Sequence, residues 1–317
     1  MQSCQICGNV DANIPFNARE MMLGLREDFQ YLECSACGCL QLQDLPADYT
    51  KYYPAGYYSF AAKPDGTIKR VLKRKRAEEA LGRPSLIGAL LVRRWGLPPF
   101  TQWLEPAGLK WDDAILDVGS GSGQVLLDMM QAGFSNLTGV DPYVESDQQL
   151  GAGTRILKKH LHEVEGEFDF VLMSHSFEHM ENPAQALRET ARLLRPGHFL
   201  VVRIPVAGKY AWRKYGTDWV QLDAPRHIFV HSEDSMGLLA DQAGFTLKEV
   251  RYDSTAFQFW ASEQYRQDIP LNDERSYAVN RRRSPFTKRQ IATFEQQAKA
   301  LNASGDGDQA CFYFVRN

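Results

Sequence analysis

The feature that most constrains the fold is a short apolar strand that runs directly into a glycine-rich turn. Residues Ala114–Val118 are apolar except for Asp117, which is typical of a strand buried in a parallel sheet. Glycines at alternate positions follow, and they allow the backbone to turn tightly and to approach a ligand where any Cβ would collide. A helix is expected to begin near Val125. The strand, the turn and the helix together indicate a cofactor pocket.

A second apolar strand, Leu137–Val140, ends in Asp141, whose carboxylate can accept hydrogen bonds from both hydroxyls of a ribose. The pocket is therefore expected to hold a nucleoside. The dinucleotide fingerprint G-x-G-x-x-G would require glycine at position 124, where the chain has Gln124. This difference argues against NAD. An ordinary tight turn between a strand and a helix is the alternative interpretation.

The glycine turn resembles the acidic-x-G-x-G-x-G motif of class I S-adenosylmethionine-dependent methyltransferases, with Asp117, Gly119, Gly121 and Gly123 at the matching positions. The resemblance implies that Asp117 helps to hold the methionine end of the donor and that Asp141 holds its ribose. The donor site expected from this resemblance comprises Asp117, Gly119, Ser120, Gly121, Gly123, Asp141, Pro142, Ser174 and His175.

Composition is that of an ordinary globular protein and excludes few classes of function. The 317 residues are 44% apolar, enough for one large domain or two, and the formal net charge of −3 argues against an electrostatic nucleic-acid binder. No N-terminal stretch resembles a signal peptide, and the most apolar run, Leu86–Val92, is far shorter than the ~20 residues that span a bilayer. We therefore expect a cytoplasmic protein without a membrane span.

Two Cys-x-x-Cys pairs, Cys4 with Cys7 and Cys34 with Cys37, mark the N-terminus, and each pair is followed by a glycine. Two such knuckles can supply four thiolates to a closed tetrahedral site, the geometry of structural zinc. A closed site has no open position for substrate, so the metal is expected to support folding. A redox dithiol and an iron–sulfur centre are the alternatives.

An aromatic linker and a basic segment follow the cysteines. Tyr57 and Tyr58 belong to a tyrosine cluster broken by Pro and Gly, which could bind a saccharide or attach the N-terminal module to the rest of the chain. From position 63 to 94 there are ten Lys and Arg against three acids. Apolar spacing predicts two amphipathic helices here, separated near Gly82. Their cations could bind an acceptor, such as one that bears phosphate, or could form a solvated helix face.

The strand expected at 168–173 leads into Glu178 and His179, and Pro183 follows them. This block, through to Leu-Leu-Arg-Pro-Gly at 193–197, is similar to the middle of many small-molecule methyltransferases. Because ligands of open α/β sheets lie beyond the carboxyl ends of the strands, Glu178 and His179 could orient an acceptor or take its proton. The alternative is that His179 only caps or packs the following helix.

An insertion at 209–232 contains Trp219, Arg226 and His227, and it resembles the acceptor side of bacterial methyltransferases associated with cell-envelope sugars or secondary metabolites. Trp219 and Arg226 are interpreted as substrate-binding, Arg226 through a phosphate or carboxylate, and His227 as a possible base. Structural pairing of Arg226 with Asp223 is the competing interpretation.

These features predict an α/β fold: a Rossmann-like, doubly wound sheet of seven strands with an antiparallel last strand, a small zinc-ribbon-like N-terminal module and a helical cap. The expected domains are the Cys4 module at 1–48, the linker and cap helices at 49–100, and the methyltransferase domain at 101–317 with inserts at 209–232 and 254–309.

The expected function is methyl transfer from S-adenosylmethionine to a small-molecule hydroxyl, most plausibly on a sugar-containing or secondary metabolite. C-methylation of a nucleotide sugar and a non-catalytic, partner-binding protein are the alternatives. Related sugar C-methyltransferases have a further C-terminal domain that is not found in this sequence.

Overall fold

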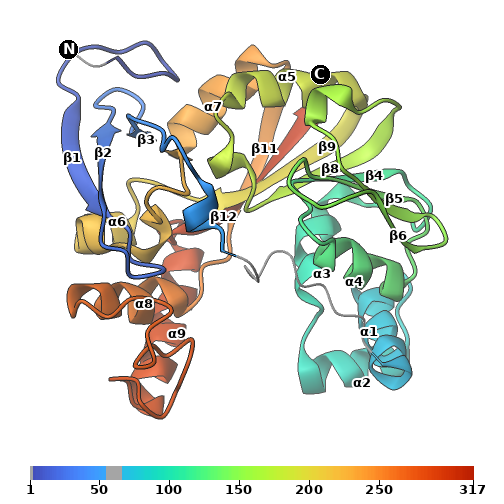
Figure 1. Cartoon of the computed structure of the whole chain (residues 1–317). Coiled ribbons are helices and arrows are strands. Elements are labelled where there is room, and N and C mark those ends of the chain that lie inside the picture. The colour runs from blue at the N-terminus through green and yellow to red at the C-terminus, as the bar shows by residue number, and fades with distance from the viewer. Residues whose placement is uncertain (1–2, 55–65) are drawn as a thin grey trace.

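The computed structural model describes residues 3–54 and 66–317 of the chain. Within these residues the larger sheet has eight strands in the order β11-β12-β9-β8-β4-β5-β7-β6 (Figure 1). The strands of this sheet are β4 (Ile115–Val118), β5 (Leu137–Val140), β6 (Gln148–Gly151), β7 (Thr154–Leu157), β8 (Phe168–Ser174), β9 (Leu194–Pro205), β11 (Phe245–Tyr252) and β12 (Gln309–Arg316).

Pairing in this sheet confirms the expected Rossmann-like topology. Strands β7, β5, β4, β8 and β9 pair in parallel, and the last strand, β12, is antiparallel to both of its neighbours, β9 and β11. Among the described residues the sheet gains one strand beyond the expected seven, because β6 adds to the edge of β7 in an antiparallel register. This short edge strand is polar and half-exposed, so no alternating apolar pattern marks it in the sequence.

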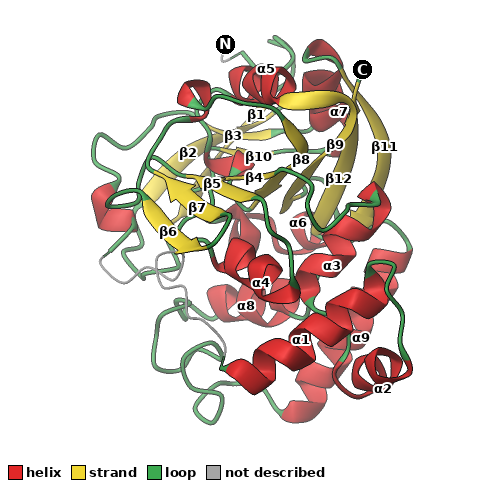
Figure 2. Cartoon of the chain, turned by 90° about the vertical axis from the view of Figure 1, so that its right-hand side faces the viewer, coloured by secondary structure: helices red, strands yellow, loops and turns green. Residues whose placement is uncertain are grey.

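Helices cover both faces of the sheet, as a doubly wound fold requires. In Figure 2, α5 (Pro183–Leu193) and α7 (Glu233–Gln242) lie above the strands, and α1 (Thr67–Ala80), α3 (Pro99–Leu104) and α4 (Gln124–Ala132) lie below them. Successive residues of β8 serve the two cores in turn: Val171 packs with the α5–α7 layer and Leu172 with the α3–α4 layer. This alternation follows from the two-residue repeat of a strand.

A second lobe joins parts of the chain that are far apart in sequence. Strands β1 (Ile14–Arg19), β2 (Asp28–Glu33) and β3 (Leu40–Leu42) form an antiparallel sheet, and β10 (Phe229–Val230) from the 209–232 insert pairs with β3. Helices α6 (Tyr210–Tyr215), α8 (Phe257–Arg266) and α9 (Lys288–Ala303) pack beneath this sheet (Figure 1). The N-terminal module and the two inserts therefore share one core.

The basic segment forms the two expected helices, α1 and α2 (Leu86–Trp95), with the turn between them at Gly82. Helix α1 contacts both α2 and α4, and the two helices project from the lower end of the molecule opposite α9 (Figure 1). Of the helices in the described parts of the chain, none has the length and apolar character needed to cross a bilayer.

Candidate active site

The glycine turn after β4 is as closely packed as its sequence suggests. Gly119, Gly121 and Gly123 all have positive φ, which favours glycine. A Cβ on Gly119 would lie 2.4 Å from the Cβ of Ser176, and a Cβ on Gly123 would lie 2.5 Å from Cδ1 of Ile156. Gly123 is also the N-cap of α4, so the turn directs the amides of a helix N-terminus toward the carboxyl edge of the sheet.

The two acids of the expected donor site lie side by side on β4 and after β5. Asp141 is 8% exposed, and its carboxylate accepts hydrogen bonds from the amides of Gly121 and Tyr143, both at 2.9 Å. Asp117 is 3% exposed, and its burial, together with the nearby charge of Asp141, raises its pKa to about 7. A buried carboxyl with such a pKa is suited to a cationic group, whose charge would favour the ionised form.

Other residues of the expected donor site offer hydrogen-bonding groups to a ligand. The hydroxyl of Ser120 is buried and has no hydrogen-bond partner among the described residues. Pro142, next to Asp141, is half-buried, and Ser174 is the last residue of β8 at the same edge of the sheet. The glycine turn leaves no space for a Cβ at two of its positions, and it lies beside a buried hydroxyl and two carboxyl groups. These features match the shape and charge of S-adenosylmethionine.

Beyond the end of β8, Glu178 lies at the centre of a histidine cluster. Its Oε1 is 3.2 Å from Nδ1 of His175 and 3.9 Å from Nε2 of His227, whereas its Oε2 is buried without a partner in the described chain. Burial alone would raise the pKa of Glu178, but the hydrogen bond from His175 and the charges of the surrounding histidines lower it to about 2. Glu178 is therefore an ionised carboxylate.

His179 and His227 face each other with ring centroids 4.9 Å apart. Nδ1 of His179 is 2.7 Å from the carbonyl oxygen of Arg226, and Nδ1 of His227 is 2.8 Å from that of Gln221. A carbonyl only accepts, so each Nδ1 donates, and in a neutral His227 ring the lone pair lies on Nε2. Burial, followed by the charge of His179, lowers the pKa of His227 to about 4. His227 is thus a neutral imidazole that can accept a proton.

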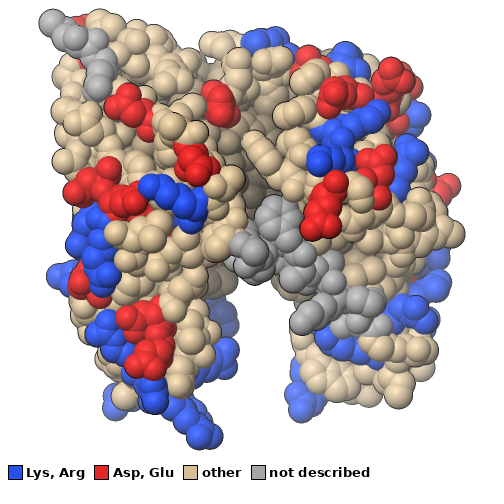
Figure 3. Space-filling view, viewed as in Figure 1, with Lys and Arg blue, Asp and Glu red and all other residues tan. Residues whose placement is uncertain are grey.

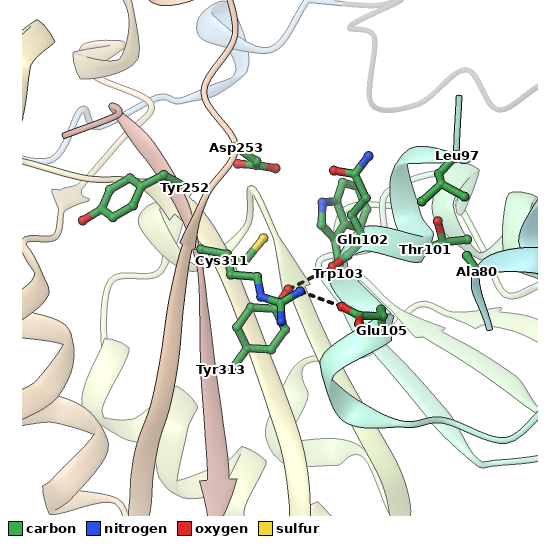
Figure 4. A pocket seen from close by; sticks show the side chains of 11 residues that line it. Ala80, Leu97, Thr101, Gln102, Trp103, Glu105, Tyr252, Asp253, Cys311 and Tyr313 are labelled. Carbon is green, nitrogen blue, oxygen red and sulfur yellow. Dashed lines mark hydrogen bonds and ion pairs between the residues drawn. The ribbon is translucent and has the colours of Figure 1, made fainter. Parts of the chain in front are cut away.

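A pocket of about 410 Å³ lies between α3 and the strands β11 and β12 (Figure 4). Gln102 and Trp103 of α3 face Asp253 across it, and Cys311 of β12 lies on the same side as Asp253. These lining residues were not predicted from the sequence, because none belongs to a motif and they come from three distant segments.

Arg203 connects this pocket to the histidine cluster. Its Nε donates to Asp253 at 2.6 Å, its guanidinium lies 4.9 Å from the ring of Trp103, and its Nη1 contacts Nε2 of His175. His175 in turn meets Glu178 and has φ of +54°, a backbone conformation that is uncommon outside glycine. His175, expected in the donor site, is thus joined to the acceptor side by these contacts.

The residues expected to bind substrate are placed differently. Arg226 is fully buried and forms ion pairs with Asp223 at 2.7 Å and Glu20 at 2.8 Å, which agrees with the structural interpretation. Trp219 is 1% exposed, and its indole donates to Asp308. Both side chains are buried in the second lobe. Tyr57 and Tyr58 lie outside the described residues.

The four cysteines of the two knuckles come together in the N-terminal module. Sulfur atoms of Cys4 and Cys37 are 3.6 Å apart, those of Cys7 and Cys34 are 3.5 Å apart, and all four lie within 4.8 Å of one another. Tetrahedral zinc with Zn–S bonds of about 2.3 Å would place sulfurs about 3.8 Å apart. Gly8 and Gly38 have positive φ and close the knuckle turns onto the carbonyls of Cys4 and Cys34.

Comparison with known proteins decides the family. Residues 69–250 match the family model described as a methyltransferase domain, which covers more than half of the chain. The chain belongs to this methyltransferase family. The match includes β4, β5, β8 and β9, whose carboxyl ends carry the expected donor and acceptor residues.

Curated relatives of this methyltransferase match parts of it. The ubiquinone biosynthesis O-methyltransferase of Pseudomonas aeruginosa is 29% identical over 174 residues, which cover 48% of this chain and 73% of that protein. An uncharacterized methyltransferase of Mycobacterium tuberculosis is 32% identical over 129 residues, 38% of this chain and 51% of its own length. The EEF1A lysine methyltransferase 2 of Danio rerio is 45% identical over 40 residues, 13% of this chain and only 17% of the relative.

Among solved structures, mycolic acid cyclopropane synthase complexed with SAH is similar with a TM-score of 0.47 and 17% identity. The match covers 71% of this chain and 85% of that one.

Proposed function

We propose that this methyltransferase transfers a methyl group from S-adenosylmethionine to a hydroxyl of a small molecule, most plausibly a sugar-containing or secondary metabolite. The observation that carries the proposal is the placement of three features along one edge of the sheet. The glycine cradle with Asp117 and Asp141 follows β4 and β5, the Glu178–histidine cluster follows β8, and the pocket lies beside β11 and β12. A relative that is 29% identical, the P. aeruginosa enzyme, is an O-methyltransferase by name.

In the proposed reaction the donor supplies an activated methyl group on a sulfonium. Asp141 would accept hydrogen bonds from the ribose hydroxyls, which would replace those it accepts from the amides of Gly121 and Tyr143. Asp117 would face the cationic methionine end. Alignment of the acceptor with the methyl carbon and exclusion of water are the main tasks of the protein.

On the acceptor side, His227 or His179 would accept the hydroxyl proton at Nε2. Glu178 would stabilise the imidazolium that forms, because it is an ionised carboxylate 3.9 Å from Nε2 of His227. Arg203 and Asp253 would hold polar groups of the acceptor at the pocket. The acceptor is thus expected to carry several hydroxyl or charged groups.

Isothermal titration with S-adenosylmethionine and S-adenosylhomocysteine tests the donor site directly. We expect binding to the purified protein and its loss in Asp141→Ala, which removes the carboxylate proposed to bind the ribose; thermal unfolding checks that the variant is folded. Absence of binding by well-folded wild-type protein would overturn the proposal.

Acceptor turnover by His179→Ala and His227→Ala tests the base. Full turnover by both variants would contradict the assignment of the base to these histidines.

We also infer that Cys4, Cys7, Cys34 and Cys37 bind one structural zinc ion. The inference rests on the sulfur spacing, and also on amides that face two of the sulfurs, since the Ile6 amide donates to Cys4 and the Cys37 amide to Cys34, each at 3.4 Å. Such bonds are favoured by thiolates. The ion would fasten the N-terminal module without taking part in the reaction.

A further inference from the structure

Helix α2 exposes most of its apolar side chains. Leu86 is 93% exposed, Leu90 68% and Ile87 64%, and Trp95 at the end of the helix is 52% exposed. Helix α1 also exposes two apolar side chains, Ile68 and Val71. An amphipathic surface helix normally buries such residues against the core.

The contact between α1 and α2 does not account for the apolar residues of α2. The fully buried residue of α2 is Gly88, which packs closely against α1: a Cβ there would lie 3.0 Å from the carbonyl oxygen of Lys75. The glycine therefore serves the helix pair, while the leucines point elsewhere. An exposed apolar patch of this kind marks an interaction site.

The segment that forms α1 and α2 is also rich in cations. Between positions 66 and 95 there are nine Lys and Arg against two acids. Arg93 and Arg94 directly precede Trp95, and the Arg94 guanidinium lies 5.6 Å from the centroid of the Trp95 ring. Arginine and tryptophan beside exposed leucines are typical of helices that lie in the interface of a bilayer.

A second basic segment lies at the same end of the molecule. Residues 280–290, which lead into α9, contain five Lys and Arg and no acid, and Arg281, Arg282, Lys288 and Arg289 are exposed. Helices α9 and α2 lie at the lower end in both Figure 1 and Figure 2. Figure 3 shows Lys and Arg gathered at the lower tips of both lobes, on either side of the hollow between them.

Residues 66–95 carry a net charge of +7 and residues 280–290 carry +5, so the rest of the chain, whose total formal charge is −3, carries −15. Such a distribution orients the protein in the field of an anionic surface. We propose that the protein docks peripherally on an anionic lipid bilayer through the lower tips of both lobes. The apolar residues of α1 and α2 enter the interface, and residues 281–289 contact the headgroups.

Charge and chemistry favour a bilayer over other occupants of this surface. A second copy of the chain would bring two strongly cationic helix pairs together, which like-charge repulsion opposes. A nucleic acid would attract the cations but would leave the aliphatic side chains without a partner. An anionic bilayer satisfies both groups, and it places the hollow between the lobes against the lipid surface. Acceptors embedded in that surface could then enter from it.

Vesicle co-sedimentation of the full chain tests the proposal, with vesicles of phosphatidylcholine alone and of phosphatidylcholine mixed with phosphatidylglycerol. We expect sedimentation with the anionic vesicles only, and at least a tenfold loss of binding in Leu86→Ser/Leu90→Ser and in Arg93→Gln/Arg94→Gln. Leu238→Ser is the matched control, because Leu238 is 41% exposed on α7 at the opposite end and should not affect binding. Thermal unfolding of each variant would check that it is folded.

Three results would overturn the docking proposal. The first is no sedimentation of folded wild-type protein with anionic vesicles, and the second is unchanged binding by folded Leu86→Ser/Leu90→Ser. The third is evidence for another occupant, either a dimer in sedimentation velocity that these two substitutions dissociate or stronger binding to duplex RNA than to vesicles at the same salt concentration. None of these measurements uses methyl transfer, so the result is independent of the proposed function.

Discussion

At the scale of single residues, Asp117 makes donor binding dependent on pH. Its pKa is raised to about 7, first by burial and then by Asp141, so it is largely protonated below that pH. A cationic donor end prefers the carboxylate. We therefore expect the affinity for S-adenosylmethionine to fall up to about tenfold for each pH unit below 7 and to level off above it. Titration calorimetry between about pH 5.5 and 8.5 measures this dependence.

The matched variant for this prediction is Asp117→Asn, which keeps the shape of the side chain and cannot ionise. Its affinity should be low and independent of pH over the same range. A wild-type affinity that does not change with pH would mean that Asp117 does not face the cationic end of the donor.

Gly119 provides a second prediction at this scale. Alanine there has to adopt φ of +72° and also meets the Cβ of Ser176 at 2.4 Å. The backbone term costs about 1–2 kcal/mol and the overpacking about 1–3 kcal/mol in free energy of unfolding. Gly197→Ala is the control, because Gly197 has φ of +76° and open space around its Cβ position. Denaturant unfolding should show a larger loss for Gly119→Ala, and equal losses would indicate that Ser176 moves aside freely.

At the scale of secondary-structure elements, Arg226 joins the insert to the N-terminal module. Its guanidinium pairs with Asp223 and with Glu20, and the side chains of Arg226 and Glu20 are fully buried. Arg226→Ala leaves a buried carboxylate unpaired, so we expect a loss of about 3–5 kcal/mol in the free energy of unfolding.

Arg213→Ala is the control for Arg226, since its pair with Asp306 is largely exposed and should contribute less than about 1 kcal/mol. Equal stability of wild-type protein and Arg226→Ala, with a raised KM for the acceptor, would favour the substrate-binding interpretation instead.

The cysteine knuckles allow an element-scale test of zinc. Purified protein should contain one zinc ion per chain by elemental analysis, and Cys34→Ser should lose the ion together with a large part of its thermal stability, because metal binding contributes to folding. Cys39→Ala removes a buried thiol outside the cluster and should retain the metal. Iron in place of zinc, or metal-free protein of unchanged stability, would contradict the inference.

Sequence reasoning succeeded where a local pattern carries the information. The apolar runs at 114–118, 137–140 and 168–173 are strands because buried parallel strands need continuous apolar residues. It failed where meaning depends on distant partners. From the sequence alone, Arg226 can be interpreted as a ligand for an anion, because the buried Glu20 that pairs with it is distant along the chain. Nothing in the residues around Asp253 or Trp103 predicts that the two line one pocket.

At the scale of the whole molecule, the shared core of the second lobe argues that the N-terminal module is not an independent domain. Tyr31 of the module donates to the carbonyl of His227, and Trp219 and Val230 pack in the same core. We expect a chain that begins at residue 49 to expose this core and to aggregate. A soluble 49–317 fragment that binds S-adenosylmethionine would contradict the prediction; solubility and calorimetry measure it.

The pairing of β3 with β10 also bears on how the chain is made. Leu40 leaves the ribosome long before its partner Val230, with most of the large sheet synthesised between them. Contacts between such distant segments form late, because a long loop must close first. The edge of β3 is thus open during much of translation, when a bare strand edge can pair with another nascent chain. The last part of this enzyme to mature would then be the part that its ribosome produces first.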